Sequence, residues 1–218
     1  MMRRVSPPAR ARRAGVIVLA GPSGSGKSRL AARLALPVVA LDDFYRDGDD
    51  PLLPRITQAV AHSLVDWDHP DSWDADRAVS ALVTLCATGR ADIPVYDIAH
   101  DGCVGHRELD LAGLAHVVAE GIFAAEIVPE LRRRGLLVAA VCVRHPCLVT
   151  FVLRLARDLR EHRKAPHVLV TRGWRLMRSE PRIVARMRTL GCEPMSPGRA
   201  EQRLRALVGA AAQPRSAA

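Results

Sequence analysis

The sequence predicts an α/β fold in which helices cover both faces of a mainly parallel sheet. From residue 16 onward, short apolar runs alternate with longer stretches of helical periodicity, as in repeated strand–helix–strand units. A glycine-rich segment, GPSGSGKS at residues 21–28, lies between the first apolar run and the first helical stretch. The length of 218 residues suits a single core, so one domain is expected.

The elements follow from the positions of these runs. The first strand is expected at 16–20, and Pro37 ends the helix predicted at 27–36. The next predicted helix begins with Asp71 or Ser72 as its N-cap and ends before Gly89. Further strands are predicted at 38–41, 92–97, 115–120 and 136–143, and further helices at 124–134, 146–162, 174–190 and 199–210.

Both ends of the chain are predicted to be disordered tails, at 1–14 and 211–218, so that the domain spans 15–210. The first tail is basic and Pro-rich and lacks the apolar core of a signal peptide. No apolar stretch approaches the ~18 residues that a membrane span needs. The five cysteines form no C-x-x-C pair and are odd in number, which favours packing thiols in a reducing compartment, and hence the cytoplasm.

The net charge of +9 raises the question of a nucleic-acid partner. Many arginines lie in the two tails or beside acidic residues on helical stretches, and only two Tyr and three Phe are available for base stacking. A solvated basic surface explains this charge, so nucleic acid is not expected as the main partner.

The glycine-rich segment fits the pattern G-x-x-x-x-G-K-S, with a strand before it and a helix after it. Glycines let the backbone N–H groups wrap a phosphate, and the helix end adds its positive dipole. Only two of the 32 basic residues are lysines, Lys27 and Lys164, which indicates that position 27 needs a compact charge. The alternative is a flexible turn with an exposed lysine. The predicted ATP-binding residues of the loop are Gly21, Ser23, Gly24, Ser25, Gly26, Lys27 and Ser28.

Three acidic residues follow predicted strands, at the sheet edge where open α/β folds bind ligands. Asp42 and Asp43 follow the second strand, and Glu120 ends the strand at 115–120. Phosphoryl transfer needs a carboxylate near the attacking hydroxyl and oxygen ligands for Mg²⁺. These acids are candidates for both roles, with a loop start or a helix cap as the alternative.

Six segments in this order resemble the uridine/cytidine kinase family of P-loop kinases, which are related to phosphoribulokinase and pantothenate kinase: GPSGSGKS, LDDFY, DWDHPDSWD, IPVYD followed by a His, AEGIF and RLARDLREH. The resemblance spans about 150 residues, from about 15 to about 165. It implies a three-layer P-loop NTPase fold with a lid at about 158–170, and a kinase that uses ATP and Mg²⁺ on a small-molecule substrate.

The resemblance also implies residue roles. Asp42 becomes the general base, Asp43 replaces the family's usual Ser, and Mg²⁺ is held by Ser28, Asp42 and Glu120. A second charge at Asp43 would raise a carboxyl pKa unless Mg²⁺ or an arginine compensates. Trp67 and Trp73 are expected to be core anchors, and His106 competes with His100 for a role at the acceptor. The implied acceptor-binding residues are Asp42, Tyr45, Asp68, Tyr96, His100 and Arg154, and Arg154 and Arg157 would clamp the phosphates.

The resemblance weakens in the lid, where His162, Arg163 and Lys164 stand in a segment that the family fills with Arg-Gly-Arg. The leading prediction is therefore an ATP-dependent kinase for the 5′-hydroxyl of uridine or cytidine, as in pyrimidine salvage. The alternatives are a kinase for another small alcohol or sugar phosphate, and a non-catalytic ATP-binding regulator. The sequence leaves open a choice between ATP and GTP and a homo-oligomeric state.

Overall fold

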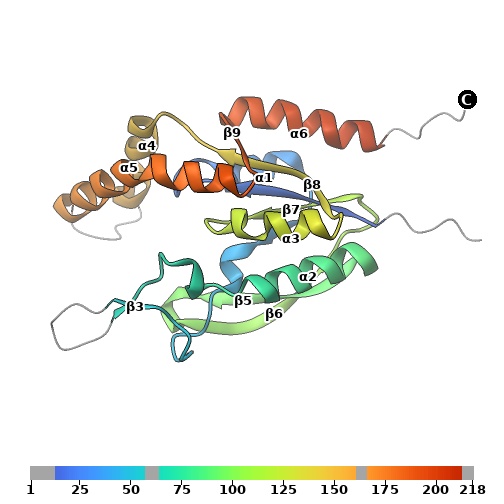
Figure 1. Cartoon of the computed structure of the whole chain (residues 1–218), viewed down its shortest axis with the longest axis horizontal. Helices are drawn as coiled ribbons and strands as arrows, with labels where there is room; N and C mark the ends of the chain where they lie inside the picture. The colour runs from blue at the N-terminus through green and yellow to red at the C-terminus, as the bar shows by residue number, and fades with distance from the viewer. Residues whose placement is uncertain (1–12, 57–63, 161–165, 213–218) are drawn as a thin grey trace, which may run out of the picture.

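The computed structural model describes residues 13–56, 64–160 and 166–212. Its centre is a five-stranded parallel sheet with the strand order β2-β7-β1-β8-β9 (Figure 1). The first predicted strand therefore lies in the middle of the sheet, between the strands that precede and follow α3. The sheet strands are β1 (Gly15–Ala20), β2 (Val38–Ala40), β7 (His116–Glu120), β8 (Leu137–Val143) and β9 (Glu193–Met195).

Helices cover both faces of this sheet, which gives three layers. Alternate residues of β1 point into two separate cores, with Val16 and Val18 in one and Ile17 and Leu19 in the other. The first core includes α2 (Ala75–Thr88), α3 (Val128–Arg133) and α5 (Pro166–Thr189). The second core includes α1 (Lys27–Leu34) and α6 (Pro197–Ala212).

A two-stranded antiparallel hairpin lies outside the central sheet, below it in Figure 1, and packs on α2. It consists of β5 (Arg90–Asp97) and β6 (Gly102–Asp110). The sequence predicted the first strand but not its partner. The reason is that β6, GCVGHRELD, has little apolar alternation and is mostly exposed. A smaller pair, β3 (Arg55–Ile56) and β4 (Leu64–Val65), completes this side.

Several predicted boundaries need correction. Helix α2 begins at Ala75 because Asp74, not Asp71 or Ser72, caps it by accepting the N–H of Arg77. The predicted helix at 124–134 is divided into a 3-10 turn, η4 (Ala124–Ile127), and α3, whose first turn contains a proline. Strand β9 was missed because its sequence, Glu-Pro-Met, forms no apolar run and contains a proline.

The remaining elements agree more closely with prediction. Helix α4 (Cys147–Arg160) lies within the predicted 146–162, while α5 begins eight residues before the predicted 174. Ala14 is buried, and its N–H donates to the carbonyl oxygen of Cys86. Helix α6 extends to Ala212. The rest of both tails lies outside the described residues. None of the helices in the described ranges is long and apolar enough to cross a membrane.

Candidate active site

The glycine loop joins β1 to α1 at the carboxyl edge of the sheet. Gly21 packs so closely against β8 that an added Cβ would lie 2.3 Å from the carbonyl oxygen of Val143. Gly21, Gly24 and Gly26 all have positive φ angles, which side chains disfavour. The hydroxyl of Ser25 is fully buried and has no hydrogen-bond partner among the residues that the structure describes. The loop therefore has the tight backbone curvature and the spare buried polar group of a phosphate cradle.

Lys27 is the first residue of α1, and its side chain crosses the loop. Its Nζ donates to the carbonyl oxygens of Gly21 at 2.8 Å and Pro22 at 3.2 Å, and the residue is only 8% exposed. No side chain in the described part of the chain caps the N-terminus of α1. The N-terminus of this helix, with the positive end of its dipole, therefore lies beside the ammonium group, which is the arrangement of an anion-binding loop.

Ser28 and Glu120 meet across the edge of the sheet. Glu120 ends β7 and lies between Leu19 of β1 and Ala40 of β2 in the strand register. The hydroxyl of Ser28 donates to Glu120 Oε1 at 2.9 Å. This hydroxyl and the carboxylate supply oxygen atoms only, which are the ligands that Mg²⁺ prefers.

Asp42 lies beside the same corner, in the 3-10 turn η1 (Leu41–Phe44) that follows β2. A Cβ added at Gly121 would lie 3.0 Å from Asp42 Oδ1, so the carboxylate directly adjoins the segment after Glu120. Asp42, Glu120 and Ser28 are therefore brought together by three neighbouring strand ends. Their chemistry fits a Mg²⁺ ion and a proton acceptor.

Both carboxylates have raised pKa values. For Asp42, burial by surrounding protein raises the pKa although solvent still reaches the side chain, and the positive charge of Lys27 opposes this shift. For Glu120, burial again raises the pKa, against the hydrogen bond from Ser28 and the charge of Lys27. The charge of the Lys27 ammonium group opposes the rise in the pKa of both Asp42 and Glu120, so both acids lie within electrostatic reach of the phosphate loop.

Asp43 points away from this corner and toward the hairpin. Its Oδ1 accepts the backbone N–H of Tyr96 at 3.5 Å, and its Oδ2 lies 3.7 Å from Nη2 of Arg107 on β6. Burial raises the pKa of Asp43, and the Tyr96 N–H and Arg107 oppose that rise. The compensating arginine anticipated for the second acid is thus present, on a strand that the sequence did not predict.

Aromatic residues line the side of the site next to the hairpin. The ring of Tyr45 lies 5.7 Å from that of Tyr96 and 5.9 Å from that of Trp67, centroid to centroid. Burial raises the pKa of Tyr45 most, and the nearby charges of Asp42 and Asp68 raise it further. Tyr45 therefore lies next to Tyr96, with the charges of Asp42 and Asp68 in its surroundings.

The two tryptophans differ from each other. Trp73 is 3% exposed and donates its Nε1–H to the carbonyl oxygen of Leu41 at 2.6 Å, so it is the core anchor that was expected. The same expectation is wrong for Trp67, which is half-buried and packs edge-on against Tyr45 and Tyr96. It belongs to the aromatic wall of the site because the turn after β4 carries it there.

His100 lies at the tip of the hairpin and is largely exposed, with 70% of its side chain accessible. Its Nδ1 is 2.6 Å from a carboxylate oxygen of Asp97, in the residue next to Tyr96. His106, the competing histidine, instead contacts Arg77 of α2 through its Nε2 at 3.1 Å.

The predicted arginine clamp and lid are only partly visible. The backbone of Arg154 and Arg157 lies in α4, but their side chains fall outside the described residues. The altered lid residues His162, Arg163 and Lys164 lie in the segment 161–165, which is also outside them.

Comparison with known proteins adds an independent line of argument. The uridine kinase of Saccharomyces cerevisiae is 29% identical over 151 residues, which are 66% of this chain and 29% of the yeast protein. The uridine kinase of Borrelia garinii is 27% identical over 153 residues, which are 66% of this chain and 67% of that protein. The chain thus spans less than a third of the yeast relative's length. No model of a known protein family matches the chain.

A solved structure shares the fold. That of a proposed fructose transport system kinase from Silicibacter sp. TM1040 superposes with a TM-score of 0.60 at 22% identity, over 84% of this chain and 89% of that one. Together with the parallel sheet and the glycine loop, this similarity establishes a three-layer α/β/α P-loop NTPase fold. The chain is a relative of the uridine kinase-like P-loop kinases.

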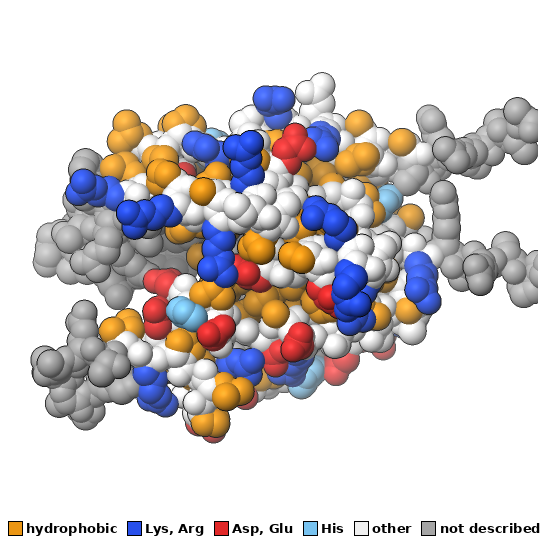
Figure 2. All heavy atoms as spheres, viewed as in Figure 1, with side chains coloured by type: hydrophobic (Ala, Val, Ile, Leu, Met, Phe, Trp, Pro, Cys, Tyr) orange, Lys and Arg blue, Asp and Glu red, His pale blue; other side chains and the backbone are white. Residues whose placement is uncertain are grey.

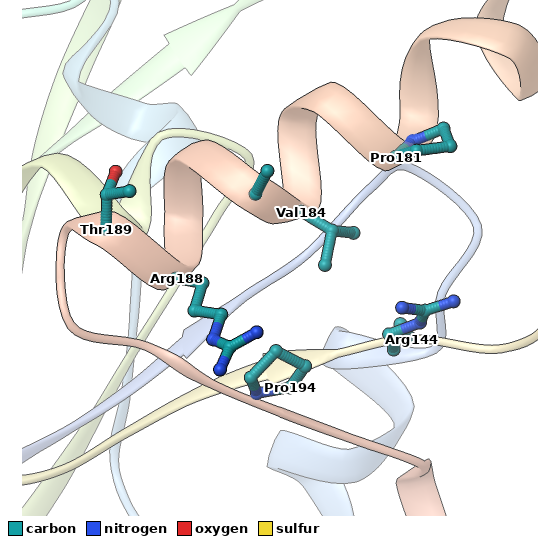
Figure 3. Close-up of a pocket in the computed structure, with 7 residues that line it drawn as sticks. Arg144, Pro181, Val184, Arg188, Thr189 and Pro194 are labelled. Carbon is teal, nitrogen blue, oxygen red and sulfur yellow. The ribbon is translucent and has the colours of Figure 1, made fainter.

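The structure also contains a groove whose lining includes none of the predicted site residues. It has a volume of about 580 Å³ and lies between α5 and the end of β8 and β9 (Figure 3). Arg144 lies at one end and directly follows Val143, whose carbonyl packs on Gly21, so the groove starts beside the phosphate loop. Sequence reasoning missed Arg107, because its contact with Asp43 depends on how the hairpin packs against the turn after β2.

Proposed function

We propose that the chain is an ATP- and Mg²⁺-dependent kinase that phosphorylates a hydroxyl group of a small molecule, with the 5′-hydroxyl of uridine or cytidine as the leading acceptor. The observation that carries this proposal is the meeting of Lys27, Ser28, Glu120 and Asp42 at one edge of the sheet. The relatives named uridine kinase support a nucleoside as the acceptor.

Bound ATP and Mg²⁺ would supply the phosphoryl group and part of the charge that neutralises it. In the proposed reaction, Asp42 accepts the proton of the acceptor hydroxyl as that oxygen forms its bond to the γ-phosphorus. The bond from the γ-phosphorus to the bridging oxygen breaks, and ADP leaves. Lys27 offsets the charge that develops on the phosphates, and Ser28 and Glu120 are the residues that would hold the metal with Asp42.

Charge on the acceptor side favours an uncharged acceptor over a sugar phosphate. Residues 42–110 contain 15 of the 23 acidic residues but only 5 of the 32 basic ones. In Figure 2, most acidic side chains of the visible face gather over its lower part, where α2 and the hairpin lie, and Lys and Arg dominate the upper part. The negative charge of residues 42–110 would repel a phosphorylated acceptor.

The test is acceptor-dependent release of ADP. Purified protein with ATP and Mg²⁺ is offered uridine, cytidine, pantothenate, glycerate, fructose and ribulose 5-phosphate in turn. The proposal expects turnover with a pyrimidine nucleoside, its loss in EDTA and no turnover with the sugar phosphate. Turnover with a different alcohol would reassign the acceptor. Tight ATP binding with no product from any acceptor would favour the regulator.

A further inference from the structure

The hairpin is attached to the segment that carries Asp42 by two carboxylates of that segment. Asp43 Oδ1 accepts the N–H of Tyr96 at 3.5 Å, and Asp47 Oδ1 accepts the N–H of Cys103 at 2.7 Å. Tyr96 and Cys103 face each other in the β5–β6 register, at the position where that register shifts by one residue. The two carboxylates therefore bind both strands of the hairpin at its irregular position.

Two further contacts bring the same segments together. The N–H of Gly48 donates to the carbonyl oxygen of Asp101 at 2.6 Å. The approach is so close that a Cβ at Gly48 would lie 3.0 Å from the Cβ of Asp101. Arg107, on β6, faces Asp43 Oδ2 at 3.7 Å and offsets its charge. Residues 43–48 thus follow the hairpin from its middle to its tip.

We propose that Asp43 and Asp47 are positioning residues that fix the hairpin, and with it Tyr96 and His100, relative to Asp42. The inference rests on the proposed function, in which the hairpin side of the site receives the acceptor. An acceptor hydroxyl must reach Asp42 while the rest of the molecule contacts the hairpin. Loosening the hairpin should therefore weaken acceptor use without affecting the phosphate loop.

The steady-state test compares variants of Asp47. Asp47→Ala removes the acceptor of the Cys103 N–H and is expected to raise the KM for the acceptor about tenfold, with the KM for ATP within about twofold of wild type. Asp47→Asn keeps a side-chain oxygen and is expected to restore most of the loss. The matched control is Arg90→Met, which removes the ion pair with Asp110 at the opposite end of the hairpin.

The Asp43 contact is tested by a double-mutant cycle with its partner. Asp43→Asn retains an oxygen for the Tyr96 N–H but loses the charge that faces Arg107, and Arg107→Met loses the same interaction from the other side. Their effects on acceptor KM are expected to be non-additive. Additive effects, or an acceptor KM that Asp47→Ala leaves unchanged, would overturn the positioning role.

Hydrogen exchange measured by NMR separates this inference from the proposed function. The amides of Tyr96 and Cys103 are expected to exchange about tenfold faster in Asp43→Ala and Asp47→Ala respectively, and to be unaffected in Arg90→Met. Unchanged exchange in both alanine variants would overturn the inference. A wild-type protein without acceptor-dependent ADP release would contradict the proposed function, while the exchange rates would still decide whether these carboxylates hold the hairpin.

Discussion

The phosphate loop is built into the central sheet, whereas the acceptor side is built on a hairpin outside it. Gly21 packs on β8, and Lys27 is 8% exposed and bonded to the loop's own carbonyls. On the other side, His100 is mostly exposed, and Tyr96 is positioned through a strand pairing that includes an irregularity. The first region is fixed by local sequence and buried packing, and the second mainly by long-range hydrogen bonds between polar side chains and the hairpin backbone.

This contrast predicts that the largest losses follow from changes in the loop. Lys27→Ala is expected to lower turnover by about 10²–10³-fold, because the compact charge inside the loop is lost. Lys27→Arg should not restore activity, since a planar guanidinium does not fit the same space. ADP release measures both, with circular dichroism as a check of folding. An active Lys27→Ala protein would contradict the site.

A change where the two regions meet should have an intermediate effect. In Gly121→Ala, the added methyl group would lie 3.0 Å from Asp42 Oδ1, and the expected displacement of the carboxylate lowers kcat about tenfold. Gly105→Ala is the control, because a Cβ there meets nothing within 4 Å. Equal kcat values for the two variants would show that Asp42 tolerates displacement.

The raised pKa of Glu120 predicts that its ionised carboxylate lowers the stability of the fold. A carboxyl whose pKa is higher in the folded than in the unfolded state destabilises the fold wherever it is ionised in both. Without Mg²⁺ and nucleotide, Glu120→Gln should therefore raise Tm at pH 7, by ~2 °C. This gain in Tm should disappear as the pH falls below the ordinary pKa range of glutamate, where Glu120 is protonated in both the folded and the unfolded state.

A surface glutamate provides the control of opposite sign. Hydrogen bonds and charge from Arg133 and Arg134 lower the pKa of Glu130 to about 2. Its ionised form therefore stabilises the fold above the ordinary glutamate range, and this contribution is lost as the pH falls toward 2. Glu130→Gln should lower Tm slightly at pH 7. Scanning calorimetry across pH checks both variants, and a Glu120→Gln protein that is less stable at pH 7 would contradict the account.

The smallest effect is expected at the tip of the hairpin. His100 is exposed and held by Asp97, so His100→Ala should change the acceptor KM by no more than about threefold and leave kcat unchanged. A tenfold or larger rise in the acceptor KM of His100→Ala would indicate that the acceptor binds nearer to the tip of the hairpin than to the aromatic wall of Tyr45, Trp67 and Tyr96.

What the sequence could predict follows the same division. The loop, the strands around it and the acids at their ends are marked by local patterns, namely the glycine spacing and apolar runs that end in a carboxylate. Strand β6 lacks such a pattern, so Arg107 and the contacts of Asp43 and Asp47 were not predictable. Trp67 was misassigned because burial depends on what packs against a side chain, which a single sequence does not reveal.

The most direct test of the account is the paired measurement of kcat and ATP affinity in Asp42→Asn. The account predicts a kcat for the acceptor at least about 100-fold below wild type, because the proton acceptor is lost, with the Kd for ATP in calorimetry without metal essentially unchanged. A variant that turns over at the wild-type rate would show that Asp42 does not serve the reaction, and the proposed meeting of the two regions would be wrong.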